Sequence, residues 1–154
     1  MYAARLGIPH TVDVYDSSTW RRLREIPTPC CSATEFSPHT LQVTDDHILV
    51  CCFDEDELHV LSHSGELLQT TSGEPMNAPG VLRSPYLCHV DAEGSALVAD
   101  KVNDRLQVMA ADGTWSVVDL DQTVTHPMGA VWYKMSLYIL IRVANDTKIV
   151  TFSQ

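Results

Sequence analysis

In this 154-residue chain, the histidines and acidic residues between positions 54 and 63 have a spacing that could bind a metal ion. His59 and His63 lie four residues apart, a spacing that chelates a metal only when both project from one face of a helix. In a strand followed by a turn they diverge, so we interpret them as a surface pair. The acidic run 54–57 lacks the alternating ligands and the glycine of a calcium loop. We interpret it as a solvated loop that could contact a basic partner.

The five cysteines do not follow the spacing of a disulfide framework or of a CxxC zinc knuckle. They are Cys30, Cys31, Cys51, Cys52 and Cys88. We therefore expect free thiols and a reducing, cytoplasmic location. The sequence also has no nucleophile elbow, phosphate-binding loop or dinucleotide fingerprint. It predicts a protein that is not an enzyme and that holds no cofactor and no metal.

Asp100, Asn103, Asp104 and Arg105 form the sharpest polar cluster in the sequence. One interpretation is a loop that faces a ligand. The other is structural: Asp100 accepts backbone N–H groups across a turn, and Arg105 pairs with an acid. We favour the structural interpretation.

The segment Ser84–Leu120 must position these residues, and it predicts four short strands. Each run has four to six residues, is rich in valine, leucine and aromatic residues, and is bounded by Gly, Asp or Asn. The expected strands are Tyr86–Asp91, Ser95–Asp100, Arg105–Ala110 and Trp115–Leu120. Asp112-Gly113 supplies the turn that a tight hairpin needs. Such a four-stranded antiparallel meander is the unit of a β-propeller blade.

This unit recurs at offsets of roughly 42 to 48 residues, the period of propeller blades. Pro38, Pro85 and Pro127 open successive copies, and Thr11–Asp16 matches a third strand. Residues 1–9 show no clear pattern. The predicted blades are 10–26 (partial), 39–72, 86–120 and 128–154 (partial). The sequence thus predicts an all-β fold over 1–154: a partial β-propeller of about three to four four-stranded blades, or half of a six-bladed ring.

Composition narrows the function classes. Ten basic residues against 20 acidic ones give a net charge of −10, which argues against binding to a phosphate backbone as the main activity. The sequence contains no run of eighteen apolar residues, so it predicts no membrane span. The segment formed by the first ten residues is too short and too polar for a signal peptide.

The phrase ALVADKVNDRLQVMAADG resembles the NHL repeat: a valine-rich strand, an Asp, a short loop with Asn, an Arg-hydrophobic strand and a Gly turn. The order of the repeats is similar to the C-terminal half of the NHL propeller of tripartite-motif proteins. The likeness is incomplete, because Cys52 and Val143 replace Asp100, and Glu57 and Lys148 replace Arg105, in the other copies. No RING segment precedes the repeats, so the resemblance does not imply ubiquitin-ligase activity.

The resemblance implies a non-catalytic scaffold that binds a protein partner through loops between strands. The alternative is RNA binding on the face built by the loops Phe53–Asp56, Lys101–Asp104 and Arg142–Asp146, which we rank lower because acids dominate them. The candidate binding residues are Asp54, Glu55, Asp56, Lys101, Asp104, Arg142, His39 and Tyr86. A third alternative is a lyase or hydrolase of the propeller type, which holds zinc with histidines on the innermost strands. Tyr86 and Met128 stand where further ligands equivalent to His39 would be needed, so we disfavour it.

A half-ring leaves an apolar blade face open at each end. We expect Val12, Val14 and Leu23 to be exposed at one end. At the other end we expect Trp132, Leu140, Ile141, Ile149 and Phe152, with residues 148–153 as an unpaired edge. Exposed apolar patches favour association, so the isolated chain is expected to self-associate.

Overall fold

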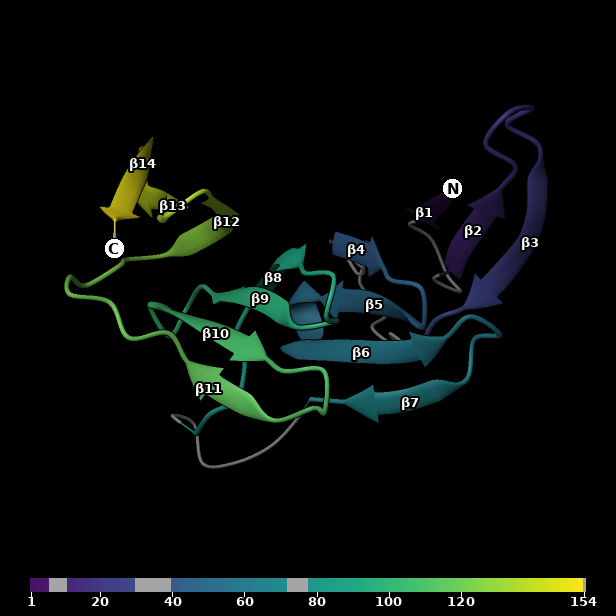
Figure 1. Cartoon of the computed structure of the whole chain (residues 1–154), viewed down its shortest axis with the longest axis horizontal. Coiled ribbons are helices and arrows are strands. Elements are labelled where there is room, and N and C mark those ends of the chain that lie inside the picture. The colour runs from purple at the N-terminus through teal and green to yellow at the C-terminus, as the bar shows by residue number, and fades with distance from the viewer. Residues whose placement is uncertain (6–10, 30–39, 72–77, 154) are drawn as a thin grey trace.

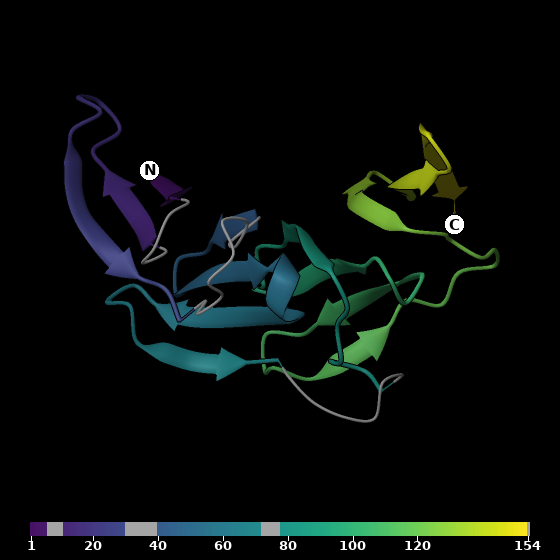
Figure 2. The ribbon, with the colours of Figure 1, turned by 180° about the vertical axis from the view of Figure 1, so that it is seen from behind.

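Four antiparallel β-sheets follow one another along the chain and form an arc (Figures 1 and 2). The computed structural model describes residues 1–5, 11–29, 40–71 and 78–153. The edge strands β1 (Tyr2–Arg5), β4 (Thr40–Val43), β8 (Pro85–Val90) and β12 (Pro127–Tyr133) lie toward the concave side of the arc. This arrangement is an all-β partial propeller, as the sequence predicts.

The sheets contain three or four strands each, in simple sequential order. Sheet 1 consists of β1, β2 (Thr11–Tyr15) and β3 (Arg22–Pro27). Sheet 2 consists of β4, β5 (His47–Cys52), β6 (Glu57–Ser62) and β7 (Leu67–Thr70), with the 3-10 turn η1 (Phe53–Glu55) between β5 and β6. Sheet 3 consists of β8, β9 (Ala96–Asp100), β10 (Arg105–Met109) and β11 (Trp115–Val117). Sheet 4 consists of β12, β13 (Ser136–Val143) and β14 (Asp146–Ser153). None of the helical structure in these ranges has the length and apolar character needed to cross a membrane.

Strand β1 is the main departure from the expected elements. The sequence shows no clear pattern over residues 1–9, but Tyr2 pairs with Val14 and the sheet has three strands. The chain terminus is held in place because the Met1 ammonium donates to the Tyr15 carbonyl at 2.8 Å. The four strands expected within Ser84–Leu120, by contrast, are present as β8 to β11, with bounds that differ by one to three residues.

Apolar side chains fill the space between neighbouring sheets. Strand β5 is buried on both faces: Ile48 and Val50 belong to the cluster shared with sheet 1, and Leu49 and Cys51 to the cluster shared with sheet 3. A strand covered on both sides reads as a continuous apolar run rather than an alternating one. That is why HILVCC carries no polar residue after its histidine.

Sheet 1 does not leave the expected apolar flank open. Val12 and Val14 are only 0% and 8% exposed, because they pack against sheet 2. The opposite side of β2 carries the polar residues Thr11 and Asp13, which are also buried. The expectation of exposed valines is therefore wrong, and of the three predicted residues only Leu23 is exposed.

Sheet 4 does present an apolar outward face. Leu140 and Ile149 are 37% and 69% exposed. Trp132 is also exposed, but it pairs with Leu137 and so lies on the opposite face, toward sheet 3. Ile141 and Phe152, also expected on the flank, instead pack in the cluster shared with sheet 3. Among the strands that the structure describes, β14 pairs with β13 alone, so it forms the expected free edge.

The buried carboxylate of Asp100 anchors the segment that joins sheet 2 to sheet 3. Asp100 is 0% exposed, and its Oδ1 accepts the backbone N–H of Arg83 at 2.7 Å. Its Oδ2 accepts the Arg105 Nε at 2.8 Å and the Gln107 Nε2 at 2.9 Å. Asn103 donates to both oxygens. The carboxylate therefore has a structural role and pairs with Arg105 as expected. The backbone N–H that it accepts comes from the connecting segment and not, as expected, from across the turn.

Two of the partners of Asp100, Arg105 and Gln107, extend the anchor along the connecting segment. Arg105 Nη2 donates to the carbonyls of Ala78 and Val81 at 3.1 and 2.8 Å. Gln107 Oε1 accepts the N–H of Gly80 at 2.9 Å. Within residues 78–84, which form neither strand nor helix, several backbone polar groups are thus satisfied by the side chains of sheet 3.

Two further aspartates hold the first residues of the next sheet. Asp56 Oδ1 accepts the N–H of Ser84 at 2.6 Å, and Asp104 Oδ1 accepts the N–H of His126 at 2.7 Å. Each aspartate directly precedes the third strand of its sheet, and each partner directly precedes the first strand of the next. The carboxylates therefore fix where β8 and β12 begin.

We predict that Asp100→Asn lowers the free energy of unfolding by about 3–5 kcal/mol, because it leaves the partly buried Arg105 guanidinium without its counter-charge. Urea denaturation followed by circular dichroism measures this. Asp112→Asn is the matched control, since Asp112 lies in an exposed turn of the same sheet. Equal midpoints for the two variants would contradict the anchoring role.

Candidate functional site

Two aromatic rings and a lysine meet on the face of the arc formed by the loops between second and third strands. The Phe53 and Tyr86 rings lie 5.2 Å apart in an edge-on arrangement with an interplanar angle of 62°. Lys101 Nζ lies 5.1 Å from the Phe53 centroid and 5.8 Å from the Tyr86 centroid. Cation–π attraction of this kind adds to the packing of the rings. We call these three residues the loop-face cluster.

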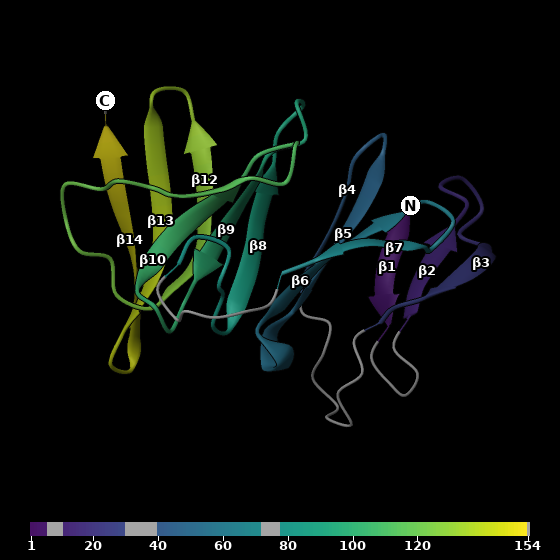
Figure 3. The ribbon, with the colours of Figure 1, turned by 90° about the horizontal axis from the view of Figure 1, so that it is seen from below.

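Three separate elements supply the loop-face cluster. Phe53 opens η1, Tyr86 is the second residue of β8, and Lys101 directly follows β9. The hydrogen bond from Ser84 to Asp56 fixes β8 against the turn that carries Phe53. Figure 3 shows η1 and the turn between β13 and β14 on the same side of the molecule.

Arg142 adds a second positive charge near Tyr86. Burial raises the pKa of the Tyr86 hydroxyl above its usual value, the nearby Cys51 thiol contributes in the same direction, and Arg142 opposes the shift. The cation is thus close enough to favour the phenolate electrostatically. The structure therefore brings Tyr86 and Lys101 together, and Arg142, a third candidate from the sequence, acts on Tyr86 through its charge.

An apolar pocket of about 410 Å³ adjoins the loop-face cluster and shares Tyr86 with it. Its walls come from the first strands of sheets 2, 3 and 4 and from the outward face of sheet 4. The lining residues are Thr40, Tyr86, Leu87, Cys88, Met128, Gly129, Ala130, Val131, Tyr138, Leu140 and Ile149. Tyr86 and Met128 share this pocket, in agreement with the register in which the sequence places them. His39 lies outside the described residues.

The acidic candidates divide into two kinds. Asp56 and Asp104 are engaged in holding the next sheet, as described above. Asp54 is exposed and Glu55 half-buried, and both lie on η1 beside Phe53. Sequence reasoning missed Phe53, although its position directly after β5 matches that of Lys101 after β9.

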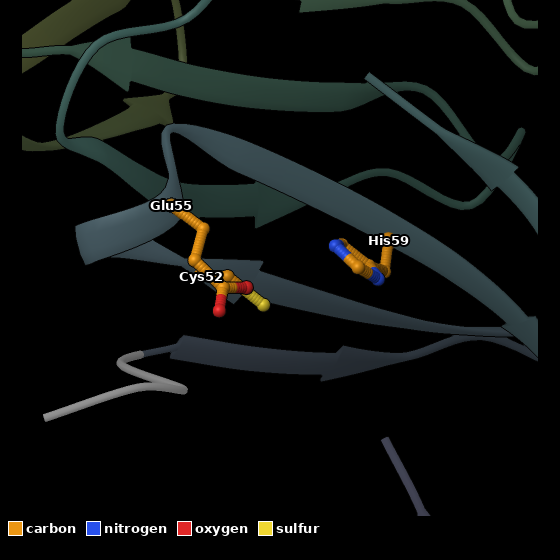
Figure 4. Close-up of side chains that lie close together, drawn as sticks. All are labelled: Cys52, Glu55 and His59. Atoms are coloured by element: carbon orange, nitrogen blue, oxygen red, sulfur yellow. The ribbon is translucent and has the colours of Figure 1, made fainter. Parts of the chain in front are cut away.

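A second gathering of side chains was also missed. One sulfur, one carboxylate oxygen and one ring nitrogen from Cys52, Glu55 and His59 lie within 4.8 Å of one another (Figure 4). The expectation that His59 is a surface residue is wrong, because its side chain lies on the face of β6 that packs toward sheet 1 and is 3% exposed. His63 is half-buried elsewhere, with Nε2 3.1 Å from the Thr44 carbonyl.

The cysteines only partly follow the sequence-based expectation. Cys51 and Cys88 are free thiols, but Cys52 is disulfide-bonded, so the expectation of a free thiol there is wrong. Cys30 and Cys31 lie outside the described residues.

No family model matches the chain, and no curated protein matches it. Solved structures with a β-propeller-like fold do resemble it. A streptogramin B lyase structure is 19% identical with a TM-score of 0.59, and the match covers 94% of this chain and 48% of that one. Virginiamycin B lyase from Staphylococcus aureus is 11% identical with a TM-score of 0.59, and the match covers 99% of this chain and 55% of that one. The computationally designed Ika4 protein is 13% identical with a TM-score of 0.62, and the match covers 99% of this chain and 84% of that one.

These likenesses support the fold alone. The chain spans about half the length of the two lyases it resembles.

The two free thiols generate a prediction about alkaline stability. Burial raises the pKa of Cys51 to about 12 and that of Cys88 to about 11, from 9.0. A raised pKa means that the unfolded thiol ionises first, so stability is intact below pH 9 and falls as the pH rises toward 11–12. Urea midpoints measured from pH 8 to 11 should fall less steeply for Cys51→Ala than for the unmodified chain. Parallel slopes would contradict the assignment.

Proposed function

We propose that this chain is a non-catalytic interaction scaffold, an NHL-like propeller segment that binds a protein partner at the loop-face cluster and its adjoining pocket. The observation that carries the proposal is the meeting of Phe53, Tyr86 and Lys101 beside an apolar pocket. Aromatic residues at the centre of an interface, next to a site that excludes water, contribute most of the binding energy in protein complexes.

The chemistry of the surface defines the partner. The pocket suits an apolar side chain, because Leu87, Met128 and Leu140 are among its walls. Asp54 and Glu55 offer negative charge at the rim, and the chain carries a net charge of −10. The partner is therefore an extended segment with one apolar anchor and basic residues next to it.

Two other functions rank lower on the same surface. RNA binding would use the aromatic rings for stacking, but the Phe53 and Tyr86 rings pack against each other, and acids on the loops repel phosphates. A lyase or hydrolase of the propeller type ranks last, because neither Tyr86 nor Met128 offers the metal ligand that such chemistry requires. A cytoplasmic location stays a prediction.

The binding proposal is tested with peptides selected from a display library on the purified chain. We predict enriched peptides with an apolar residue flanked by lysine or arginine. Tyr86→Ala and Lys101→Glu should each weaken their binding by about tenfold or more. Trp20→Ser, in the exposed turn between β2 and β3, is the matched control. Retained peptide binding in both variants, or nanomolar selective binding of single-stranded RNA, would contradict the proposal.

We also propose that the isolated chain pairs with a second copy through the outward face of sheet 4. This face exposes Val131, Tyr138, Leu140 and Ile149 and ends in the free edge of β14. The same four side chains line the apolar pocket, so pairing and partner binding compete for this face. The other inter-sheet spaces in the arc are filled by apolar clusters. Burying the same kind of surface against another copy is favourable by about 25 cal/mol per Å².

Sedimentation velocity at micromolar concentration tests this pairing. Ile149→Lys should shift the chain to monomer, because a charge in the centre of the contact is costly to desolvate. Leu23→Lys is the control: Leu23 is 62% exposed on sheet 1, away from the proposed contact. A stable monomer of the unmodified chain would overturn the proposal.

A further inference from the structure

The side chains of Cys52, Glu55 and His59 meet because of strand register and one short turn. Cys52 pairs with Glu57 and Val50 pairs with His59, so Cys52, Glu57 and His59 all lie on one face of the β5–β6 hairpin. The turn η1 then brings Glu55 back over the end of that face. Figure 4 shows the Glu55 carboxylate beside the Cys52 sulfur, with the His59 ring next to them.

The imidazole of His59 has one engaged and one unengaged nitrogen. Nε2 lies 2.7 Å from Glu57 Oε2, while Nδ1 has no hydrogen-bond partner among the described residues. A buried polar atom without a partner is costly. A carboxylate that accepts from one ring nitrogen leaves a lone pair on the other, and metal-bound histidines are held in this way.

The donor set favours a cation of the zinc class. Sulfur and nitrogen ligands suit Zn²⁺ and Co²⁺, whereas Ca²⁺ and Mg²⁺ prefer oxygen alone. Ligands of a tetrahedral zinc ion are roughly 3.3–3.8 Å apart, given bond lengths of about 2.0–2.3 Å. The three candidate ligand atoms lie within 4.8 Å of one another, so they must move closer together to bind the ion. The half-exposed Glu55 side chain can make part of this movement. A fourth ligand position is left for water.

The disulfide at Cys52 controls whether this donor set exists. A sulfur in a disulfide is not a thiolate and does not ligate zinc in the manner of cysteine. A dithiol reductant transfers two electrons and two protons to the disulfide, giving two thiols, and is itself oxidised to a disulfide. The Cys52 thiol then releases its proton as the sulfur binds the cation.

We propose that the reduced chain binds one zinc-class divalent cation through Cys52, Glu55 and His59, and that formation of the Cys52 disulfide abolishes the site. Glu57 orients the imidazole and does not need to touch the ion. The site shares none of the three residues of the loop-face cluster, although Glu55 also lies at the rim of the interaction surface. Its test uses the metal alone, so its outcome does not depend on the interaction proposal.

The test uses Co²⁺ added to the full chain after reduction with a phosphine, which does not compete for the metal as a dithiol would. The reduced chain should bind one equivalent, with a thiolate-to-cobalt charge-transfer absorption that Zn²⁺ abolishes by displacement. The oxidised chain should show neither. Cys52→Ser should abolish the charge-transfer band, and His59→Gln should weaken binding. Glu57→Gln should weaken Zn²⁺ binding by about 10–100-fold, as expected for a residue that orients a ligand.

Cys88→Ser and His63→Gln are the matched controls, because each removes a residue of the same type outside the cluster, and both should bind as the unmodified chain does. Circular dichroism confirms that each variant is folded. If Cys52→Ser does not fold, the comparison of reduced and oxidised chain together with His59→Gln decides the matter. Absence of a charge-transfer band in the reduced chain, equal binding by the oxidised chain, or unchanged binding by His59→Gln would overturn the proposal.

Discussion

A chain that builds one sheet after another must satisfy the backbone N–H groups of each segment that enters a new sheet. Carboxylates from the preceding strands and loops meet this need here. Asp100 accepts from Arg83, Asp56 from Ser84, and Asp104 from His126. Hydrogen bonds to ionised acceptors are stronger than neutral ones. The turn of sheet 4 between β13 and β14 has Ala144 at its left-handed position, where sheets 2 and 3 have Asp56 and Asp104.

The same carboxylates determine what the loop face can do. By fixing the start of β8, Asp56 and Asp100 place Tyr86 against Phe53 and bring Lys101 over both rings. The loops are thus held rigidly, and a rigid aromatic surface loses little conformational entropy on binding. Asp56 and Asp104, two of the binding candidates from the sequence, thus help to support the loop face.

Much of the fold could be predicted because strands, turns and repeat period are local properties. The middle strands of sheets 2 and 3 are apolar runs with clear boundaries, whereas Tyr2–Arg5 has no pattern and becomes a strand only by pairing with β2. Which side of a strand is covered is not a local property. Val12 and His59 were placed on the surface, yet both face an inter-sheet space. Phe53 belongs to the loop-face cluster because its ring contacts Tyr86 of the neighbouring sheet, a contact that the local sequence does not reveal.

The most direct test of the carboxylate anchors is amide hydrogen exchange at Arg83. This residue lies outside the strands, yet its N–H donates to a carboxylate that is 0% exposed. Exchange measured by NMR should be as slow as at Val98 in the middle of β9, because both amides would open only with the sheet. Exchange at Arg83 at the rate of an unprotected loop, with Val98 still protected, would contradict the central role given to Asp100.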